Sequence, residues 1–214
     1  MPKPIKRIFW DWNGTLLDDC AYAIAVRNRI FPQFGLPAIA DIATYREQFT
    51  FPVRIYYERA GVTEDIFDEV AHAWMNEYVR GQATIPLQEG AKETLAALKE
   101  KGIKQAILTA SERTIITQQL QDTGVAKYFD TVLALDDIYA HSKVAVGCAF
   151  LQQSGENPQE CVLIGDTLHD ADVAKAMGVA CVLVAKGHHS KERLRTCGVP
   201  VMDCLSEACN YIMD

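Results

Sequence analysis

Basic residues, membrane-length hydrophobic runs and zinc-type cysteine motifs are all scarce or missing in this sequence of 214 residues. Its 21 lysines and arginines are outnumbered by 28 aspartates and glutamates, which leaves a net charge of −7. A nucleic-acid-binding surface needs a basic face for the phosphate backbone, so we expect no nucleic-acid partner. No run of apolar residues is long enough to span a bilayer, and we expect no membrane partner either.

The seven cysteines are odd in number and include no Cys-x-x-Cys pair or Cys/His cluster with zinc spacing. Several lie in apolar runs such as CVLIGD, where a reduced thiol packs like a small hydrophobic side chain. The N-terminal sequence MPKPIKRIFWDWNG has only a short apolar stretch, which is not typical of a signal peptide. We therefore predict reduced cysteines and a cytoplasmic protein. The choice between a monomer and a homodimer stays open.

The composition that is present is typical of a globular protein, with 49% hydrophobic and 23% charged residues. Short β-rich runs alternate with helical patterns, most of which end at a glycine. Nearly continuous apolar strands indicate a parallel sheet covered on both faces, so the pattern predicts an α/β fold with a doubly wound parallel sheet. The predicted strands are Ile5–Trp10, Ile103–Thr109, Phe129–Ala134, Cys161–Gly165 and Ala180–Ala185, and the predicted helices are Glu89–Lys101, Ser111–Thr123, Ser142–Ser154 and Leu168–Met177.

The interval between the first and second predicted strands breaks this alternation and has helical patterns throughout. Thr63 is a candidate N-cap for a helix in which apolar residues recur at spacings near three and four as far as Tyr78. Asp19–Phe31 and Ile39–Phe49 are weaker candidates. The predicted division is therefore an inserted helical subdomain over residues 17–87 and an α/β core domain over residues 1–16 and 88–214.

Candidate site residues, most of them polar or charged, follow the first four predicted strands. The carboxyl ends of parallel strands are the edge at which an open α/β sheet binds its ligands, so these residues are expected to converge. They are Asp11, Asn13, Gly14 and Thr15 after the first strand, Thr109, Ala110 and Ser111 at the end of the second, Lys143 beyond the third, and Asp166, His169 and Asp170 after the fourth.

These residue types suit phosphoryl transfer. A carboxylate at a strand end can act as a nucleophile and form an acyl phosphate that water later cleaves. Two carboxylates from different strands offer the oxygen ligands that Mg²⁺ prefers. A hydroxyl and an ammonium group can bind phosphoryl oxygens and offset developing charge. Gly14 permits a sharp turn that brings backbone amides close to a phosphate.

The motifs, in this order, resemble those of the haloacid dehalogenase-like (HAD) hydrolase superfamily, and most of all its phosphoglycolate phosphatase-like branch with an α-helical cap. They are Asp11-x-Asn13-Gly14-Thr15, Thr109, Lys143 and Gly165-Asp166-x-x-x-Asp170. The resemblance covers essentially the whole chain. It implies a Rossmann-like HAD core with an inserted cap, and a Mg²⁺-dependent phosphatase that acts on a small phosphorylated metabolite through an aspartyl-phosphate intermediate.

The resemblance also implies a role for each motif residue. Asp11 would be the nucleophile, and Lys143 would both bind phosphate and steady Asp11. Asp170 would ligate the metal or orient its waters, while Asn13 would lend its backbone carbonyl. The implied catalytic residues are Asp11, Asn13, Thr109 and Lys143; the implied substrate-binding residues are Gly14, Thr15, Thr109, Ala110, Ser111 and Lys143; the implied Mg²⁺ ligands are Asp11, Asn13, Asp166 and Asp170.

One position departs from the family pattern. The family's phosphatases usually carry a second aspartate two residues after the nucleophile as general acid and base, and this chain has Asn13 there. An amide cannot donate a proton to a leaving alkoxide near neutral pH. Two alternatives therefore stay open: another HAD chemistry without the second aspartate, such as carbon–halogen or phosphonate cleavage, and a catalytically weak phosphate- or protein-binding module. A phosphonatase is expected to use a cap lysine, and residues 17–87 contain none.

Several side chains near these motifs have both a functional and a structural interpretation. We predict that His188 and His189 lie in an exposed polar loop and that His169 faces solvent, although each is close enough in sequence to reach the site. Trp10 and Trp12 are predicted to pack in the core. Three arginines of the inserted segment, Arg27, Arg46 and Arg54, could anchor a distal anion of the substrate, but surface positions are expected for each of them.

Overall fold

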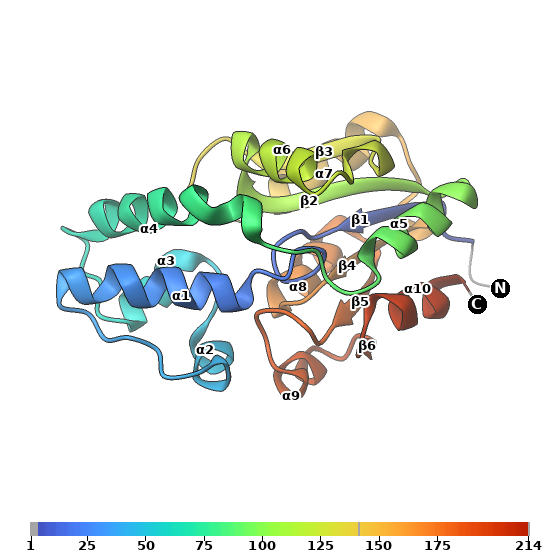
Figure 1. Ribbon diagram of the computed structural model, residues 1–214. Helices are drawn as coiled ribbons and strands as arrows, with labels where there is room; N and C mark the ends of the chain where they lie inside the picture. Colours follow the sequence, from blue (N-terminus) through green and yellow to red (C-terminus); the bar gives the residue numbers. More distant parts are fainter. Residues whose placement is uncertain (1–3, 141, 214) are drawn as a thin grey trace.

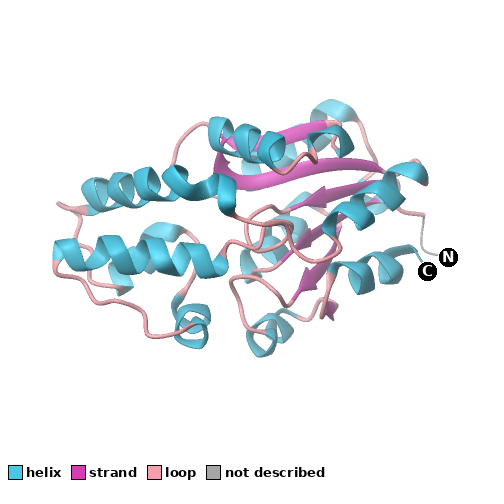
Figure 2. Cartoon of the chain, viewed as in Figure 1, coloured by secondary structure: helices cyan, strands magenta, loops and turns pink. Residues whose placement is uncertain are grey.

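The computed structural model describes residues 4–140 and 142–213, so residues 1–3, 141 and 214 of the predicted core domain lie outside the described residues. Its strands form one parallel sheet in the order β3-β2-β1-β4-β5-β6 (Figures 1 and 2). Because the first strand lies inside the sheet and later strands extend it to both edges, the predicted doubly wound α/β fold is confirmed. The strands are β1 (Arg7–Trp10), β2 (Lys104–Glu112), β3 (Thr131–Leu135), β4 (Cys161–Gly165), β5 (Ala180–Val184) and β6 (Val201–Met202), and the helices that follow them are α5 (Ala91–Glu100), α6 (Arg113–Asp122), α7 (Val144–Ser154), α8 (Leu168–Met177), α9 (Lys191–Leu194) and α10 (Leu205–Met213).

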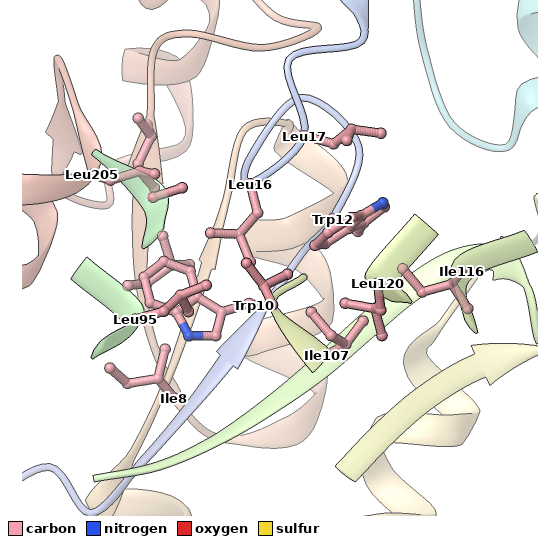
Figure 3. Close-up of a cluster of buried hydrophobic side chains, with 14 of the residues drawn as sticks. Ile8, Trp10, Trp12, Leu16, Leu17, Leu95, Ile107, Ile116, Leu120 and Leu205 are labelled. Carbon is pink, nitrogen blue, oxygen red and sulfur yellow. The ribbon is translucent and has the colours of Figure 1, made fainter. Parts of the chain in front are cut away.

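Helices cover both faces of this sheet. On one face, Ile8 and Trp10 of β1 pack in a cluster that includes Leu95 of α5 and Leu205 of α10 (Figure 3). On the opposite face, Phe9 belongs to a second cluster formed with α7 and α8. Successive strand residues point to opposite faces, so burial on both sides requires the continuous apolar runs that the strands carry.

Four further helices lie between β1 and α5 in the chain, and we call them the inserted helices. They lie beyond the carboxyl ends of the strands, with the first and the last side by side (Figures 1 and 2). A separate and largely aromatic cluster that includes Phe31, Tyr45 and Tyr57 holds them together. The strand ends therefore face this group of helices, which are α1 (Cys20–Ile30), α2 (Ile42–Gln48), α3 (Val53–Arg59) and α4 (Phe67–Gly81).

Some local predictions are wrong. β2 continues through Ala110 and Ser111 to Glu112, so the next helix begins two residues later than predicted. The Glu112 side chain accepts hydrogen bonds from backbone amides of the first turn, and this cap fixes the start of α6. Thr63 is not the N-cap of α4, which begins at Phe67. Neither α3 nor the two-residue β6 is among the predicted elements.

The predictions for the cysteines and the tryptophans hold. The seven cysteines are free thiols. Trp10 and Trp12 are fully buried, and their indole N–H groups donate to the side chains of Gln105 and Gln119 at 3.1 and 2.8 Å. Over the part of the chain that the structure describes, no helix combines the length and the apolar character needed to cross a membrane.

Candidate active site

Lys143 joins two of the predicted carboxylates at the carboxyl ends of the strands. Its ammonium nitrogen lies 2.5 Å from Oδ1 of Asp11, which follows β1, and 2.7 Å from Oδ1 of Asp170 in the first turn of α8. It also donates to the carbonyl oxygen of Leu108 on β2 at 2.9 Å. With 2% of its surface exposed, Lys143 is a buried cation held by three neighbouring segments of the sheet edge.

Thr15 connects Asp11 to the third predicted carboxylate. The hydroxyl oxygen of Thr15 lies 3.1 Å from Oδ2 of Asp11 and 2.7 Å from Oδ1 of Asp166. The other oxygen of Asp166 accepts the backbone N–H of His188 at 2.6 Å. Gly14 has a φ of +76°, and a Cβ there would lie 2.4 Å from Asp166 Oδ2. The turn after β1 therefore needs glycine both for its conformation and for its close approach to Asp166.

Asp170 also fixes the start of α8. Its Oδ2 accepts the backbone N–H and the hydroxyl of Thr167 at 3.0 and 2.6 Å, and the Asp170 N–H is directed at the Thr167 hydroxyl in a capping box. The capping role and a role in the site are compatible, because the cap uses one oxygen of Asp170 and Lys143 contacts the other.

Burial and charge act in opposite directions on these groups. Burial raises the pKa of Asp11, and it raises the pKa of Asp166 well above the ordinary value. Burial acts the same way on Asp170, but the charge and hydrogen bond of Lys143 outweigh it and lower the pKa of that carboxyl. Burial opposes the charge of Lys143, yet Asp11 and Asp170 raise its pKa above the usual lysine value. The Lys143–Asp170 pair is therefore ionised at neutral pH.

Asn13 points toward a buried acid, Asp19, which is not among the predicted site residues. The Asn13 amide donates to Oδ2 of Asp19 at 2.8 Å and accepts the hydroxyl of Ser111 at 2.7 Å. Asp19 in turn lies 3.3 Å from Nε2 of His188. Asp19 directly precedes α1. Its contact with His188 forms because the loop that carries His188 folds onto the start of this helix.

The prediction that His188 and His189 are exposed is wrong, since 5% and 2% of their surfaces are accessible. Burial acts to lower the pKa of His188, but the acidic groups Cys20, Tyr45 and Asp19 around it raise that pKa well above the usual histidine value. Burial lowers the pKa of His189 to about 3. The Nδ1 of His189 accepts the Leu168 backbone N–H at 3.1 Å, which requires an unprotonated nitrogen. The pKa shifts of the two neighbours therefore have opposite directions, with the charged form favoured at His188 and the neutral form at His189.

A cavity of about 150 Å³ opens onto Asp11. Among the predicted residues, Asp11, Asn13, Thr109, Ala110, Ser111, Lys143 and Asp170 line it, whereas Gly14, Thr15 and Asp166 are not part of its lining. The opposite wall is built by the inserted helices and is rich in aromatic side chains, including Tyr45, Phe49, Tyr56, Phe67 and Trp74. A ligand bound to Asp11 would therefore contact both parts of the chain.

Two predictions about solvent exposure around this cavity are also wrong. His169 is only partly exposed, lines the cavity and stacks on Phe51 with ring centroids 4.9 Å apart. Arg27 has 2% of its surface exposed and lines the cavity as well. Arg46 donates to the backbone oxygens of Lys186 and Gly187, which ties α2 to the loop after β5. Arg54 pairs with Glu64 beside the ring of Phe67.

Comparison with known proteins identifies the family to which this chain belongs. Residues 8–184 match the model of the haloacid dehalogenase-like hydrolases. The chain is 24% identical over 193 residues to phosphoglycolate phosphatase 1 of Pseudomonas aeruginosa, covering 86% of this chain and 71% of the relative. It is 25% identical to the phosphoglycolate phosphatase of Synechococcus elongatus, with 89% and 88% covered. A solved structure of a predicted phosphatase from Clostridium acetobutylicum has the same fold, with a TM-score of 0.87, 18% identity and 98% and 99% coverage. The family model spans most of the chain, and this protein therefore belongs to the haloacid dehalogenase-like hydrolases.

Proposed function

We propose that this protein is a Mg²⁺-dependent phosphomonoester hydrolase for a small phosphorylated metabolite, similar to the phosphoglycolate phosphatases among its relatives. The observation that carries the proposal is the cluster of Asp11, Asp166 and Asp170, in which one carboxylate oxygen from each residue lies within 4.8 Å of the other two, beside the ammonium of Lys143. When all three carboxylates are ionised, Lys143 compensates only part of their charge. A divalent cation would compensate the rest.

The donor set fits Mg²⁺, which prefers oxygen ligands. Asp11 and Asp166 would hold the ion through carboxylate oxygens, Asn13 through its backbone carbonyl, and Asp170 directly or through a water molecule. Burial and nearby like charges raise the pKa of Asp11 and of Asp166, and a bound cation would remove that penalty. When bound, the ion would neutralise charge on the phosphoryl group.

Asp11 is the nucleophile in this proposal. One of its carboxylate oxygens attacks phosphorus and forms a new P–O bond, while the bond from phosphorus to the leaving oxygen breaks. Lys143 orients Asp11, and Thr109 and Ser111, which line the same cavity, bind phosphoryl oxygens. The leaving alkoxide takes up a proton from water, because the Asn13 amide cannot supply one. A water molecule then attacks phosphorus, which releases phosphate and restores the Asp11 carboxylate.

The inserted helices complete the proposal as a cap. Residues 17–87 would cover a core formed by residues 1–16 and 88–214, and their aromatic side chains would exclude water from the cavity. A dry cavity strengthens the electrostatic contacts that stabilise the transferring phosphoryl group.

Titration with Mg²⁺ tests the metal assignment. Calorimetry should show one site, and Asp166→Ala should weaken binding strongly, whereas Asp122→Ala, which removes an exposed carboxylate on α6, should not. Mg²⁺ should also raise the melting temperature of the unsubstituted protein, because a ligand that binds the native state stabilises it. Equal Mg²⁺ affinity in the Asp166→Ala variant would remove the assignment.

A further inference from the structure

The side chain of Asn13 is fully engaged by its neighbours. Its amide nitrogen donates to Oδ2 of Asp19 at 2.8 Å and to the hydroxyl of Tyr78 at 3.0 Å. Its amide oxygen accepts the hydroxyl of Ser111 at 2.7 Å. An asparagine side chain has two donor hydrogens, so these contacts use both of them. The position that lacks an acid is therefore also closed as a hydrogen-bond donor to a leaving group.

The ionisable groups beside Asn13 are engaged as well. Nε2 of His188 lies 3.3 Å from Asp19, and Nδ1 of the same ring lies 2.7 Å from the hydroxyl of Tyr45. A carboxylate that accepts donors at both oxygens carries no proton to give. Within the described part of the chain, the surroundings of Asn13 therefore offer no unused acid to a leaving oxygen. Asp19 accepts from the Asn13 amide, the Gly14 backbone N–H, the Tyr78 hydroxyl and the His188 ring.

A substrate can react without an acid when its leaving group is a weak base. In the first step an oxygen of Asp11 bonds to phosphorus, and the electron pair of the broken P–O bond stays on the leaving oxygen. A phenol has a pKa of about 10, as in tyrosine, whereas an alcohol is similar to water, with a pKa of about 16. A phenoxide can therefore leave as the anion, whereas an alkoxide needs a proton in the transition state.

The cavity wall has apolar surface that an aromatic ring can cover. Phe51, Trp74 and Met75 of the inserted segment line the cavity and are only partly buried. Ile115, in the first turn of α6, adds a partly buried side chain from the other side. The cavity volume of about 150 Å³ equals that of an engineered cavity that binds benzene, which limits the leaving group to about one ring. The charged leaving group of an acyl phosphate or a phosphoanhydride would be desolvated against this surface.

We propose that the preferred substrate is the phosphate monoester of a small phenol. Its ring lies against Phe51 and Trp74, its phosphoryl group reaches Asp11, and its phenoxide leaves as the anion. Water then cleaves the acyl phosphate and restores the Asp11 carboxylate. This inference rests on the proposed hydrolase function and deepens it by naming the leaving group. It also explains why a phosphatase site can keep Asn13 at the position of an acid.

Three esters separate the ring from the basicity of the leaving group. Phenyl phosphate has an aromatic ring and a weakly basic leaving group, benzyl phosphate keeps the ring but loses an alkoxide, and phosphoglycolate has an alkoxide and no ring. With Mg²⁺ present, kcat/KM should be about 10²-fold or more higher for phenyl than for benzyl phosphate, because assistance by an acid contributes about 10² to 10⁴ in rate. Values for these two esters within about threefold of each other would overturn the inference.

His169 is the alternative proton donor, because it lines the cavity and its buried Nε2 has no partner among the described residues. The ratio of kcat/KM for phenyl and benzyl phosphate should be the same in His169→Gln as in the unsubstituted protein. A ratio that rises in the variant would show that His169 protonates the leaving oxygen, and the inference would fail.

Trp74→Leu tests the contact with the ring, since it keeps an apolar side chain and removes the aromatic one. KM for phenyl and benzyl phosphate should rise about five- to tenfold, the size of an aromatic contact, while KM for phosphoglycolate changes by less than about threefold. Phe51→Leu provides a second variant with the same expectation. Tyr211→Leu is the matched control, because this tyrosine is 53% exposed on α10 and does not line the cavity. Equal changes of KM for all three esters in both cavity variants would overturn the ring site.

Binding and turnover together separate this inference from the hydrolase proposal. Calorimetry of phenyl phosphate with Asp11→Asn protein should show affinity that falls when Trp74→Leu is added. If all three esters are hydrolysed and phosphoglycolate has the highest kcat/KM, the inference fails and the hydrolase proposal stands. If no ester is hydrolysed although phenyl phosphate binds in this Trp74-dependent way, the hydrolase proposal fails, and the assignment of a substrate fails with it.

Discussion

Replacement of Asn13 by aspartate would place two carboxyl groups in hydrogen-bond contact. The Asn13 amide nitrogen lies 2.8 Å from Oδ2 of Asp19, so the Asn13→Asp side chain would meet a buried acid. Two unit charges about 3 Å apart at an effective dielectric constant of about 20 repel by about 5 kcal/mol. His188 stabilises Asp19 as the anion and lowers its pKa despite burial. The new carboxyl group is therefore expected to hold a proton at neutral pH.

A protonated carboxyl group at this position can serve as a general acid, a role that the Asn13 amide cannot fill. Such assistance contributes about 10² to 10⁴ in rate. We predict that Asn13→Asp raises turnover of alkyl phosphates at least tenfold, which corresponds to about 1.4 kcal/mol of barrier. The increase on p-nitrophenyl phosphate should be smaller, because a phenoxide leaves with little protonation.

Steady-state kinetics with glycerol phosphate and p-nitrophenyl phosphate tests this prediction. Asn13→Ser is the matched control, since it is polar but carries no acidic proton, and it should raise neither rate. Circular dichroism establishes that each variant is folded. Alkyl and aryl rates that are unchanged or lower in folded Asn13→Asp protein would refute the reasoning, and the proton would then come from elsewhere or the natural reaction would need none.

Two further predictions concern stability. Lys143→Met leaves Asp11 and Asp170 without their buried cation, so urea denaturation at pH 7 without metal should show a loss of about 3–5 kcal/mol, and excess Mg²⁺ should restore part of it. The pKa of Lys143 is raised in the fold, so the stability that its charge contributes is complete at pH 7 and is lost only as the pH rises through that raised value. The difference in unfolding free energy between the unsubstituted protein and Lys143→Met should therefore shrink in strongly alkaline solution. A difference that stays constant there would contradict this account. The pKa of His189 is lowered to about 3, so the unfolded chain binds a proton below about pH 6.5 that the folded chain does not. The unfolding free energy of the unsubstituted protein should therefore fall as the pH decreases from about 6.5 to about 3. The fall should be steeper than in His189→Gln by up to about 1.4 kcal/mol per pH unit. Identical pH profiles for the two proteins would exclude a neutral buried His189.

Sequence patterns predicted the parts of the site that depend on local structure and topology. β4 and α8 have the predicted bounds, because an apolar run ending at Gly165 is followed by a helix that ends at Gly178. Once the sheet is parallel, the residues after β1 and β4 must lie at one edge. Asp11 and Asp166 do lie together at that edge, where the Thr15 hydroxyl contacts both carboxylates.

The remaining part of the site depends on contacts between segments far apart in the chain. The Asp19–His188 pair forms only because the loop after β5 folds onto the start of α1, and a histidine in a glycine-bounded loop has no local sign of burial. Arg27 lies in a helix whose polar and apolar residues show no strong periodicity, so its burial under α3 was not predictable from spacing. Tertiary packing decided the exposure of each of these side chains.

The most direct test of the central proposal is to detect a phosphoryl group on Asp11. Protein quenched in acid during turnover of phosphoglycolate with Mg²⁺ should yield, by mass spectrometry, a peptide that is phosphorylated at Asp11. The corresponding peptide from Asp11→Asn protein should carry no such group, and that variant should be inactive although folded. Hydrolysis that persists in pure Asp11→Asn protein, without a phosphorylated intermediate in the unsubstituted protein, would contradict the account and indicate direct attack by water.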